Sequence, residues 1–289
     1  MVKTFADLYQ EVRSELLETE GPEGAARIAR ELVCAATGQT KADLLAGREA
    51  VVDSRAVHRL RDFVVRTREG EPLAYIIGEW DFCGMTLSVT RDVLIPRDDT
   101  MAVTELAMKK AMFLEQNPRV LDLCAGSGCI GLAVAHKVKD ARVTLGEVSP
   151  EAIRVAKKNI ADQKLSGRVS CIQLDVRQPA AKFLGTFDLI VSNPPYVTTG
   201  EYERLDPSVR DYEPRMALDG GADGLDFYRA IVKNFTSALK PGGFLCFEFG
   251  LGQQEAVCAI LEQGGYEVCQ LRDDNQGITR AVIAQHTGR

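Results

Sequence analysis

The sequence predicts an α/β fold in which a doubly wound, mostly parallel sheet follows a small helical bundle and a β-hairpin linker. Three observations predict it. Apolar residues recur at three-to-four spacing over residues 1–72, alternate with polar residues over 79–95, and form short runs separated by helical segments from residue 119 onward. These patterns are typical of amphipathic helices, of a hairpin and of βα repeats, respectively.

The first 72 residues contain three apolar series with helical spacing. They are Phe5, Leu8, Val12 and Leu16; Ile28, Leu32, Val33 and Ala36; and Val57, Leu60 and Val64. Gly21-Pro22 and Thr37-Gly38 interrupt the pattern, so we expect a bundle of about four short helices. Such a unit ahead of a larger domain either packs as a simple cap or recognises a macromolecular substrate, and the second reading is favoured by analogy.

The remaining elements follow from the alternation of apolar runs and helical patterns. A hairpin is expected around Cys83-Gly84, and Ser149-Pro150 begins a helix because serine caps it and proline suits its first position. The expected strands are 120–124, 143–148, 169–174, 187–191, 244–249, 266–271 and 278–284. The expected helices are 129–138, 150–163, 225–239 and 253–261, with a long loop at 197–224. We therefore expect three regions: a helical domain at 1–72, a linker at 73–98 and an α/β domain at 99–289.

Composition limits the class of protein. The 289 residues are 45% hydrophobic and 26% charged, which is ordinary for a globular chain with a sizeable core. The net charge of −6 argues against a broad electrostatic grip on nucleic acid phosphates. No run approaches the roughly 18 apolar residues of a membrane span, and the N-terminus does not have the pattern of a secretory signal. We therefore expect neither nucleic acid nor membrane as a partner.

Cysteine and histidine usage adds two expectations. The eight cysteines are scattered without a C-x-x-C pair, which fits reduced thiols in a cytoplasmic protein. The three histidines, His58, His136 and His286, stand apart from other residues at metal-ligand spacing. We therefore expect no metal site.

The most informative motif is Asn193-Pro194-Pro195-Tyr196, which follows the apolar run 187–192. A tetrapeptide at the end of a buried strand lies where open α/β sheets carry out chemistry. The prolines donate no backbone N–H and restrict the chain, so the carbonyls around them are rigidly oriented. The Asn193 side-chain oxygen and the Pro194 carbonyl could each accept one hydrogen of a planar NH2 group, while the Tyr196 ring covers its face. This predicts a site for an amide or an exocyclic amine.

A second motif is the glycine-rich loop 122–131, which joins the first strand of the α/β domain to its helix. Its small residues let a ligand approach the backbone closely, so a nucleotide-like cofactor is implied. Gly126-x-Gly128-x-x-Gly131 matches the dinucleotide fingerprint. Glu147 ends the next strand, at about the sequence separation from these glycines at which the fingerprint places an acid that binds ribose hydroxyls. The loop alone leaves NAD and S-adenosylmethionine open, but the pair of amide-directed acceptors favours methyl transfer.

The exit of the third strand, Asp175-Val176, is expected to hold an adenine. The aspartate would face the exocyclic amine and the valine would pack on the ring. Asp175 could instead serve only as a turn residue.

The chain resembles the peptide chain release factor N5-glutamine methyltransferase family (PrmC/HemK). The resemblance covers nearly the whole chain and includes four further matches besides the glycine loop. They are PLAYIIG at 72–78, LIPRxDT at 94–100, NPPYV at 193–197 and EPxxALxGGxDG at 213–224. The resemblance implies a helical N-terminal domain that contacts the release factor and a seven-stranded, Rossmann-like class I methyltransferase domain.

The resemblance also implies site residues. It assigns the contacts with S-adenosylmethionine to Cys124, Ala125, Gly126, Ser127, Gly128, Glu147 and Val176, to which the motif analysis adds Asp175 and Asn193. It assigns the substrate glutamine to Asn193, Pro194, Pro195 and Tyr196, with Asn193, Pro194 and Tyr196 as the catalytic residues. The chain departs from the family pattern at five positions: Asp98, Met101, Cys124, Glu147 and Val176.

The expected activity is transfer of a methyl group from S-adenosylmethionine to the glutamine N5 of the GGQ motif of class 1 release factors. Three other activities remain open. They are glutamine methylation of a ribosomal protein, adenine-N6 methylation of DNA, which would require base flipping, and NAD-dependent oxidoreduction. A silent nucleotide-binding module is a further alternative. We expect a cytoplasmic monomer.

Overall fold

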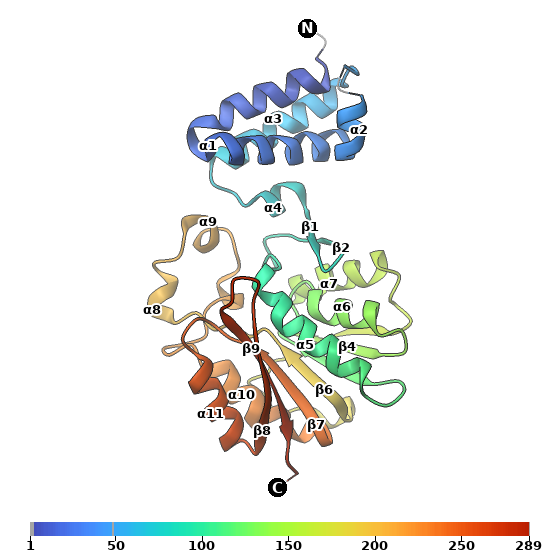
Figure 1. Ribbon diagram of the computed structural model, residues 1–289, viewed down its shortest axis with the longest axis vertical. Helices are drawn as coiled ribbons and strands as arrows, with labels where there is room; N and C mark the ends of the chain where they lie inside the picture. The colour runs from blue at the N-terminus through green and yellow to red at the C-terminus, as the bar shows by residue number, and fades with distance from the viewer. Residues whose placement is uncertain (1–2, 48, 289) are drawn as a thin grey trace. The chain divides into compact units, whose positions relative to one another are not determined.

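The computed structural model describes residues 3–47 and 49–288. The chain forms two compact units (Figure 1). The first is built from the chain up to Gly78 together with Pro207–Tyr212, and the second from Glu79–Asp206 and the chain from Glu213 onward. The expected division at residues 72 and 98 stays a prediction about independently folding regions.

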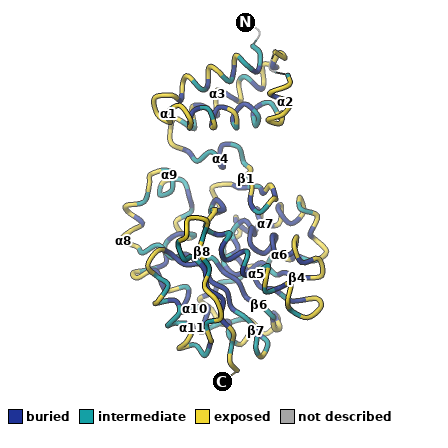
Figure 2. Tube along the Cα trace, viewed as in Figure 1, coloured by how far each residue is buried: buried dark blue, intermediate teal, exposed yellow. Residues whose placement is uncertain are grey.

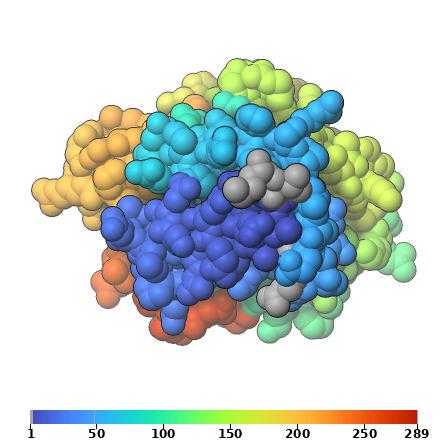
Figure 3. Space-filling view, turned by 90° about the horizontal axis from the view of Figure 1, so that it is seen from above, coloured from blue at the N-terminus to red at the C-terminus, as the bar shows by residue number. Residues whose placement is uncertain are grey.

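The first unit is helical and contains α1 (Phe5–Thr37), α2 (Lys41–Ala46), α3 (Ser54–Arg68), α4 (Leu73–Ile77) and α9 (Pro207–Arg210). Thr4 and Asp7 form a capping box that starts α1. Gly21 has non-helical backbone angles, with φ 66° and ψ 174°, and Pro22 follows it, so α1 consists of two helical segments that meet at a kink. The break expected at Gly21-Pro22 is confirmed. In Figure 3, α1 and α3 are seen closely packed against each other.

A single apolar core holds this unit together. Buried residues of α1 and α3 meet at helical spacing, as the apolar series predicts. The core includes Leu8, Val12, Leu16, Ile28, Leu32, Leu60 and Val64. At its edge the Tyr212 hydroxyl donates a hydrogen bond to the Glu69 carbonyl over 2.8 Å.

The second unit begins with the antiparallel hairpin of β1 (Glu79–Phe82) and β2 (Met85–Ser88). Both turn residues have positive φ, 50° at Cys83 and 74° at Gly84, as type I′ turns require. The predicted hairpin is therefore present.

The main sheet has seven strands in the order β5-β4-β3-β6-β7-β9-β8 (Figure 1). They are β3 (Arg119–Leu123), β4 (Arg142–Glu147), β5 (Val169–Gln173), β6 (Phe187–Ser192), β7 (Leu239–Glu248), β8 (Tyr266–Asp273) and β9 (Thr279–His286). The first five in this order pair in parallel, and β9 runs antiparallel to both its neighbours. The seven predicted strands and the mostly parallel sheet are confirmed.

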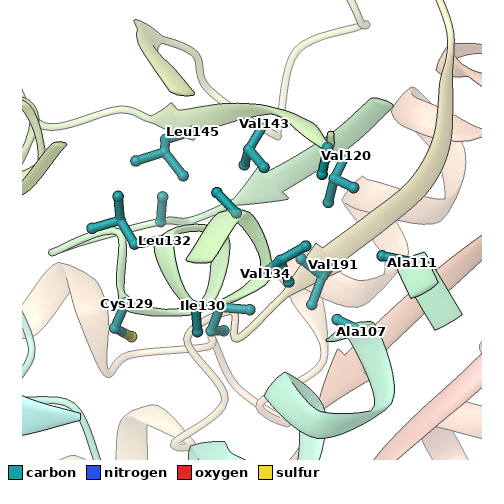
Figure 4. Packing of buried hydrophobic residues seen from close by; sticks show 14 of the residues in the cluster. Ala107, Ala111, Val120, Cys129, Ile130, Leu132, Val134, Val143, Leu145 and Val191 are labelled. Carbon is teal, nitrogen blue, oxygen red and sulfur yellow. The ribbon is translucent and has the colours of Figure 1, made fainter. Parts of the chain in front are cut away.

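Helices cover both faces of this sheet, and Figure 2 shows its central strands as buried. On one face lie α5 (Met101–Met112), α6 (Cys129–Lys137) and α7 (Pro150–Asp162), and on the other α10 (Asp226–Phe235) and α11 (Gln254–Gln263). Figure 4 shows Ile130 and Val134 of α6 among residues of β3, β4, β6 and α5. Two separate apolar cores therefore fix the carboxyl ends of the strands.

Three details differ from the sequence prediction. The helix α5 was not predicted. The helix expected at 225–239 ends at Phe235. The strand β7 begins at Leu239 rather than at 244, because Leu239 already pairs with Phe187 of β6, and a register shift separates this pair from the next one, Leu189 with Phe244. The loop 197–224 contains short helical turns, α8 (Thr199–Tyr202), α9 and one at Arg215–Ala217.

Candidate active site

A cavity of about 670 Å³ opens at the carboxyl ends of β3, β4, β5 and β6. Residues that directly follow or end these strands line it, as expected for an open α/β sheet. Of the predicted site residues, those lining the cavity are Cys124, Gly126, Glu147, Asp175, Val176, Asn193 and Pro195. The structure thus brings both sequence motifs to one space.

The glycine loop approaches this cavity with its backbone. Gly126 has a φ of 53°, and a Cβ built on it would meet no atom within 4 Å. The space beside its backbone is therefore open. Gly128 has a φ of 82°, and a Cβ would lie 2.8 Å from Leu145 Cδ1. Ala125, Ser127 and Gly128 shape the loop without lining the cavity. The loop and Glu147 form what we call the glycine-loop side of the site.

Glu147 braces the loop at the end of β4. Its Oε2 accepts a hydrogen bond from Gly126 N over 2.8 Å, and its Oε1 accepts from Val148 N and Ser149 N over 2.7 and 3.0 Å. These bonds hold the carboxylate at the cavity wall and leave one acceptor site on Oε2, because Oε1 already accepts two hydrogen bonds. An acidic residue in this place can bind the hydroxyls of a ribose.

Asp122 lies below the loop and is fully buried. Its Oδ2 accepts a hydrogen bond from Gly131 N over 2.8 Å, while its Oδ1 has no partner among the described residues. Burial raises the pKa of this carboxyl to about 7, an effect that the Gly131 hydrogen bond opposes and the nearby Glu147 charge reinforces. The loop therefore rests on a carboxyl group that titrates near neutral pH.

Asp175 and Val176 line the third strand exit. Val176 is buried, and its carbonyl accepts a hydrogen bond from Asn234 Nδ2 over 3.0 Å. Asp175 pairs with Arg177, which also lines the cavity, over 2.9 Å. Hydrogen bonds from Arg177 lower the pKa of Asp175, so this carboxylate is ionised and already engaged. Its contact with an adenine amine stays a prediction.

Asn193 lies at the tip of β6, where its side chain is held from behind. Its Nδ2 donates a hydrogen bond to Thr100 Oγ1 over 3.2 Å, and Thr100 is buried. Within the described chain no hydrogen bond uses Asn193 Oδ1 or the Pro194 carbonyl. The two predicted acceptors are therefore free, although Pro194 itself is buried and does not line the cavity.

Tyr196 follows these acceptors and is fixed by its backbone. Gln253 Nε2 donates to the Tyr196 carbonyl over 2.9 Å, and Gln253 Oε1 accepts from Gly250 N over 2.9 Å. The ring packs at the edge of the second core, and burial raises the pKa of its hydroxyl. Tyr196 does not line the cavity, so its expected place over the face of a substrate amide stays a prediction.

Several residues of the site were not predicted as functional. Thr100 belongs to the segment 94–100, and Arg97 of the same segment forms an ion pair with the buried Glu213. Glu248 ends β7, is 1% exposed, and its pKa is raised to about 7 by burial. The signals were present as the motifs at 94–100 and 213–224 and as one acid inside the apolar run 244–249. We call Asn193–Tyr196 with Thr100 and Glu248 the Asn193 side of the site.

Comparison with solved structures shows the fold to which this chain belongs. A methyltransferase from Pyrococcus furiosus aligns with 78% of this chain and 98% of its own length, with a TM-score of 0.51 and 21% identity. The catalytic domain of hMettl16 aligns with 80% of this chain and 81% of its own, with a TM-score of 0.55 and 15% identity. The fold is the Rossmann-like fold of class I methyltransferases. The model of the methyltransferase small domain also matches residues 102–205.

Comparison with known sequences narrows the class to a family. The PrmC N-terminal domain model matches residues 7–78. The release factor glutamine methyltransferase of Geobacter sulfurreducens is 40% identical over 92% of this chain and 91% of its own. The enzyme of the same name from Clostridium acetobutylicum is 37% identical over 85% and 86%, respectively. This chain belongs to the release factor glutamine methyltransferase family.

Within the described residues no helix is long and apolar enough to cross a membrane.

Proposed function

We propose that this protein transfers a methyl group from S-adenosylmethionine to the side-chain nitrogen, N5, of the glutamine in the GGQ motif of class 1 peptide chain release factors. The names of its relatives support the substrate, and the arrangement around Asn193 supports the chemistry. The observation that carries the proposal is that Thr100 binds Asn193 Nδ2, which leaves Asn193 Oδ1 as a free acceptor at the cavity wall.

The glycine-loop side fits S-adenosylmethionine. The open space above Gly126 accommodates a ligand against the backbone, and Glu147 Oε2 offers an acceptor for a ribose hydroxyl. Val176 offers an apolar surface to an adenine ring. When bound, S-adenosylmethionine supplies an electrophilic methyl group on a positively charged sulfur.

The Asn193 side orients the nucleophile. An amide nitrogen is a poor nucleophile because its lone pair is delocalised into the carbonyl. Asn193 Oδ1 and the Pro194 carbonyl each accept one N–H of the substrate amide, which directs the nitrogen lone pair toward the methyl group. The same two dipoles stabilise the positive charge that develops on the nitrogen as it bonds to the methyl group. The bond between the methyl group and sulfur breaks in the same step, S-adenosylhomocysteine leaves, and the excess proton of the nitrogen passes to water.

Positioning can supply much of the acceleration, because well-oriented groups gain on the order of 7–11 kcal/mol over free reactants. No strong base is required in this proposal. We further propose that the helical unit contacts the release factor and that the protein is a cytoplasmic monomer.

Mass spectrometry tests the proposal directly. The protein is incubated with methyl-labelled S-adenosylmethionine and, in separate reactions, a class 1 release factor, its GGQ→GGA variant, a ribosomal protein mixture and adenine-containing duplex DNA. We expect label only on the GGQ glutamine of the intact release factor. Label on a ribosomal protein or on DNA, with none on the release factor, would refute the assigned substrate. Equilibrium binding of NAD in place of S-adenosylmethionine would refute the assigned reaction.

A further inference from the structure

Glu248 is a carboxyl group in the interior of the second unit that the proposed mechanism does not use. Glu248 is the last residue of β7, next to the strand that carries the acceptor motif, since Phe247 pairs with Ser192. The side chain is 1% exposed, and its Oε2 has no hydrogen-bond partner among the described residues. A buried polar atom without a hydrogen-bond partner lowers the stability of the folded state, so its presence calls for an explanation.

Among the described residues, no cation forms an ion pair with Glu248. Arg280 of β9 is the nearby cation, but it pairs with Asp99 and Asp274, each over 3.2 Å. The other groups near the Glu248 side chain are Asp99, Thr100, Tyr196, Cys129 and Tyr228. The Tyr228 hydroxyl donates to the Glu248 backbone carbonyl over 2.8 Å. The Glu248 carboxyl therefore depends on neutral hydroxyl groups for stabilisation.

Two of those hydroxyls belong to the acceptor site. Burial raises the pKa of Glu248, and the nearby Thr100 and Tyr196 hydroxyl groups oppose this effect. Thr100 Oγ1 accepts from Asn193 Nδ2, so its own hydrogen is directed away from Asn193. The Thr100 carbonyl is bound by the Thr104 hydroxyl over 2.7 Å, which fixes the Thr100 backbone.

We infer that Glu248 is a positioning residue of the acceptor site: its carboxyl accepts the Thr100 hydroxyl hydrogen, so that Thr100 Oγ1 accepts from Asn193 Nδ2 and Asn193 Oδ1 faces the substrate amide. This inference rests on the proposed function for its kinetic consequences only. Without Glu248, Thr100 can donate its hydrogen to Asn193 Oδ1, and the asparagine amide can reverse.

Kinetics of variants test this role. Glu248→Met removes the acceptor at similar length, Glu248→Gln retains an acceptor oxygen, and Thr100→Val removes the hydroxyl while keeping the shape. We expect Glu248→Met and Thr100→Val each to lower kcat about tenfold, with the Kd for S-adenosylmethionine within about twofold of wild type. Glu248→Gln should recover kcat to within about threefold. The exposed Glu262→Met on α11 serves as the matched control and should leave kcat unchanged.

The double variant separates positioning from a general loss of packing. Thr100→Val with Glu248→Met should be no slower than either single variant, because both break one chain of hydrogen bonds. A kcat for Glu248→Met within twofold of wild type per folded molecule would overturn the inference. So would a double variant in which the two losses multiply.

The inference can also be tested without measuring activity. This second test applies even if Glu248→Met does not fold or if the wild-type protein does not methylate the release factor. The side-chain NH2 signals of Asn193, assigned by their loss in Asn193→Asp, are followed by NMR against pH in the unliganded protein. We expect a shift with a midpoint near pH 7 in wild type and in the control Asp122→Asn, and none in Glu248→Gln. Asn193 signals that do not titrate in wild type, or that titrate equally in Glu248→Gln, would overturn the inference.

Discussion

The glycine-loop side and the Asn193 side of the cavity are built in different ways. The first is made by one stretch of chain, 122–131, with a single brace from Glu147 one strand away. The second brings together segments that are far apart in sequence: Thr100, Asn193–Tyr196 and Glu248–Gln253. A single loop can bind a cofactor through the loop's own backbone, whereas orienting a substrate amide requires side chains from several elements.

This difference predicts that substitutions on the two sides separate binding from turnover. Asn193→Ala should show the largest effect, a fall in kcat of about 10² to 10³, because it removes a preorganised acceptor for the developing charge. The Kd for S-adenosylmethionine should change by less than about threefold. Steady-state kinetics and calorimetry measure the two quantities, and an equal loss in both would show that Asn193 serves cofactor binding rather than the acceptor.

Asp122 allows a test of the support under the glycine loop. The folded state keeps this carboxyl neutral, with a pKa near 7 against 3.8 in the unfolded chain. Its contribution to stability is therefore complete below about pH 4 and is lost as pH rises through 7. We expect Asp122→Asn to gain on the order of 3–4 kcal/mol of unfolding free energy relative to wild type between pH 4 and pH 8. Urea unfolding of the unliganded proteins at several pH values measures it, and a pH-independent difference would contradict the raised pKa.

Glu147→Ala tests the same side through the ligand. The substitution removes both the expected ribose acceptor and the brace on Gly126 N. We expect the Kd for S-adenosylmethionine to rise at least tenfold, or about 1.4 kcal/mol, while kcat at saturating cofactor stays within about threefold. Glu147→Ala should therefore change mainly the Kd for S-adenosylmethionine, whereas Asn193→Ala should change mainly kcat. A fall in kcat at saturation as large as that of Asn193→Ala would contradict the separation of the two sides.

Arg97 holds the segment that carries Thr100. It pairs with the buried Glu213, which also accepts from Ile95 N over 3.2 Å, and burial raises the pKa of Glu213. Arg97 is partly exposed but its partner Glu213 is buried, so Arg97→Leu should cost about 1 kcal/mol of stability at pH 5 and more at pH 8, where the carboxylate stays charged without its partner. The cost should be larger at pH 8 than at pH 5, because Glu213 can be protonated at low pH once its partner is gone. Thermal unfolding at the two pH values measures this, and an equal shift at both would contradict the ion pair.

The sequence predicted the local features of the site well. The strands at 120–124 and 187–191 and the turn residues after them follow from apolar runs broken by glycine and proline, and the structure confirms them. The hairpin at Cys83-Gly84 was equally local. Such features depend on residues within a few positions of each other, so periodicity and turn chemistry suffice to identify them.

The missed features are those that depend on contacts between distant segments. The helix α5 has a weakly marked apolar face in which Ala102, Ala107 and Ala111 pack against the sheet. The Thr100–Asn193 hydrogen bond spans 93 positions, and the burial of Glu248 is decided by which strands flank β7. No periodicity in the sequence encodes these pairings, so the support of the acceptor site required the structure.

A structure of the protein with S-adenosylhomocysteine and a peptide containing Gly-Gly-Gln tests most directly whether Asn193 and Pro194 orient the substrate. The mechanism predicts that the glutamine side-chain nitrogen lies within about 2.7–3.2 Å of both Asn193 Oδ1 and the Pro194 carbonyl oxygen. Asn193 Nδ2 should remain bound to Thr100. A glutamine amide bound elsewhere in the cavity, or an Asn193 that turns its nitrogen toward the substrate, would contradict the mechanism.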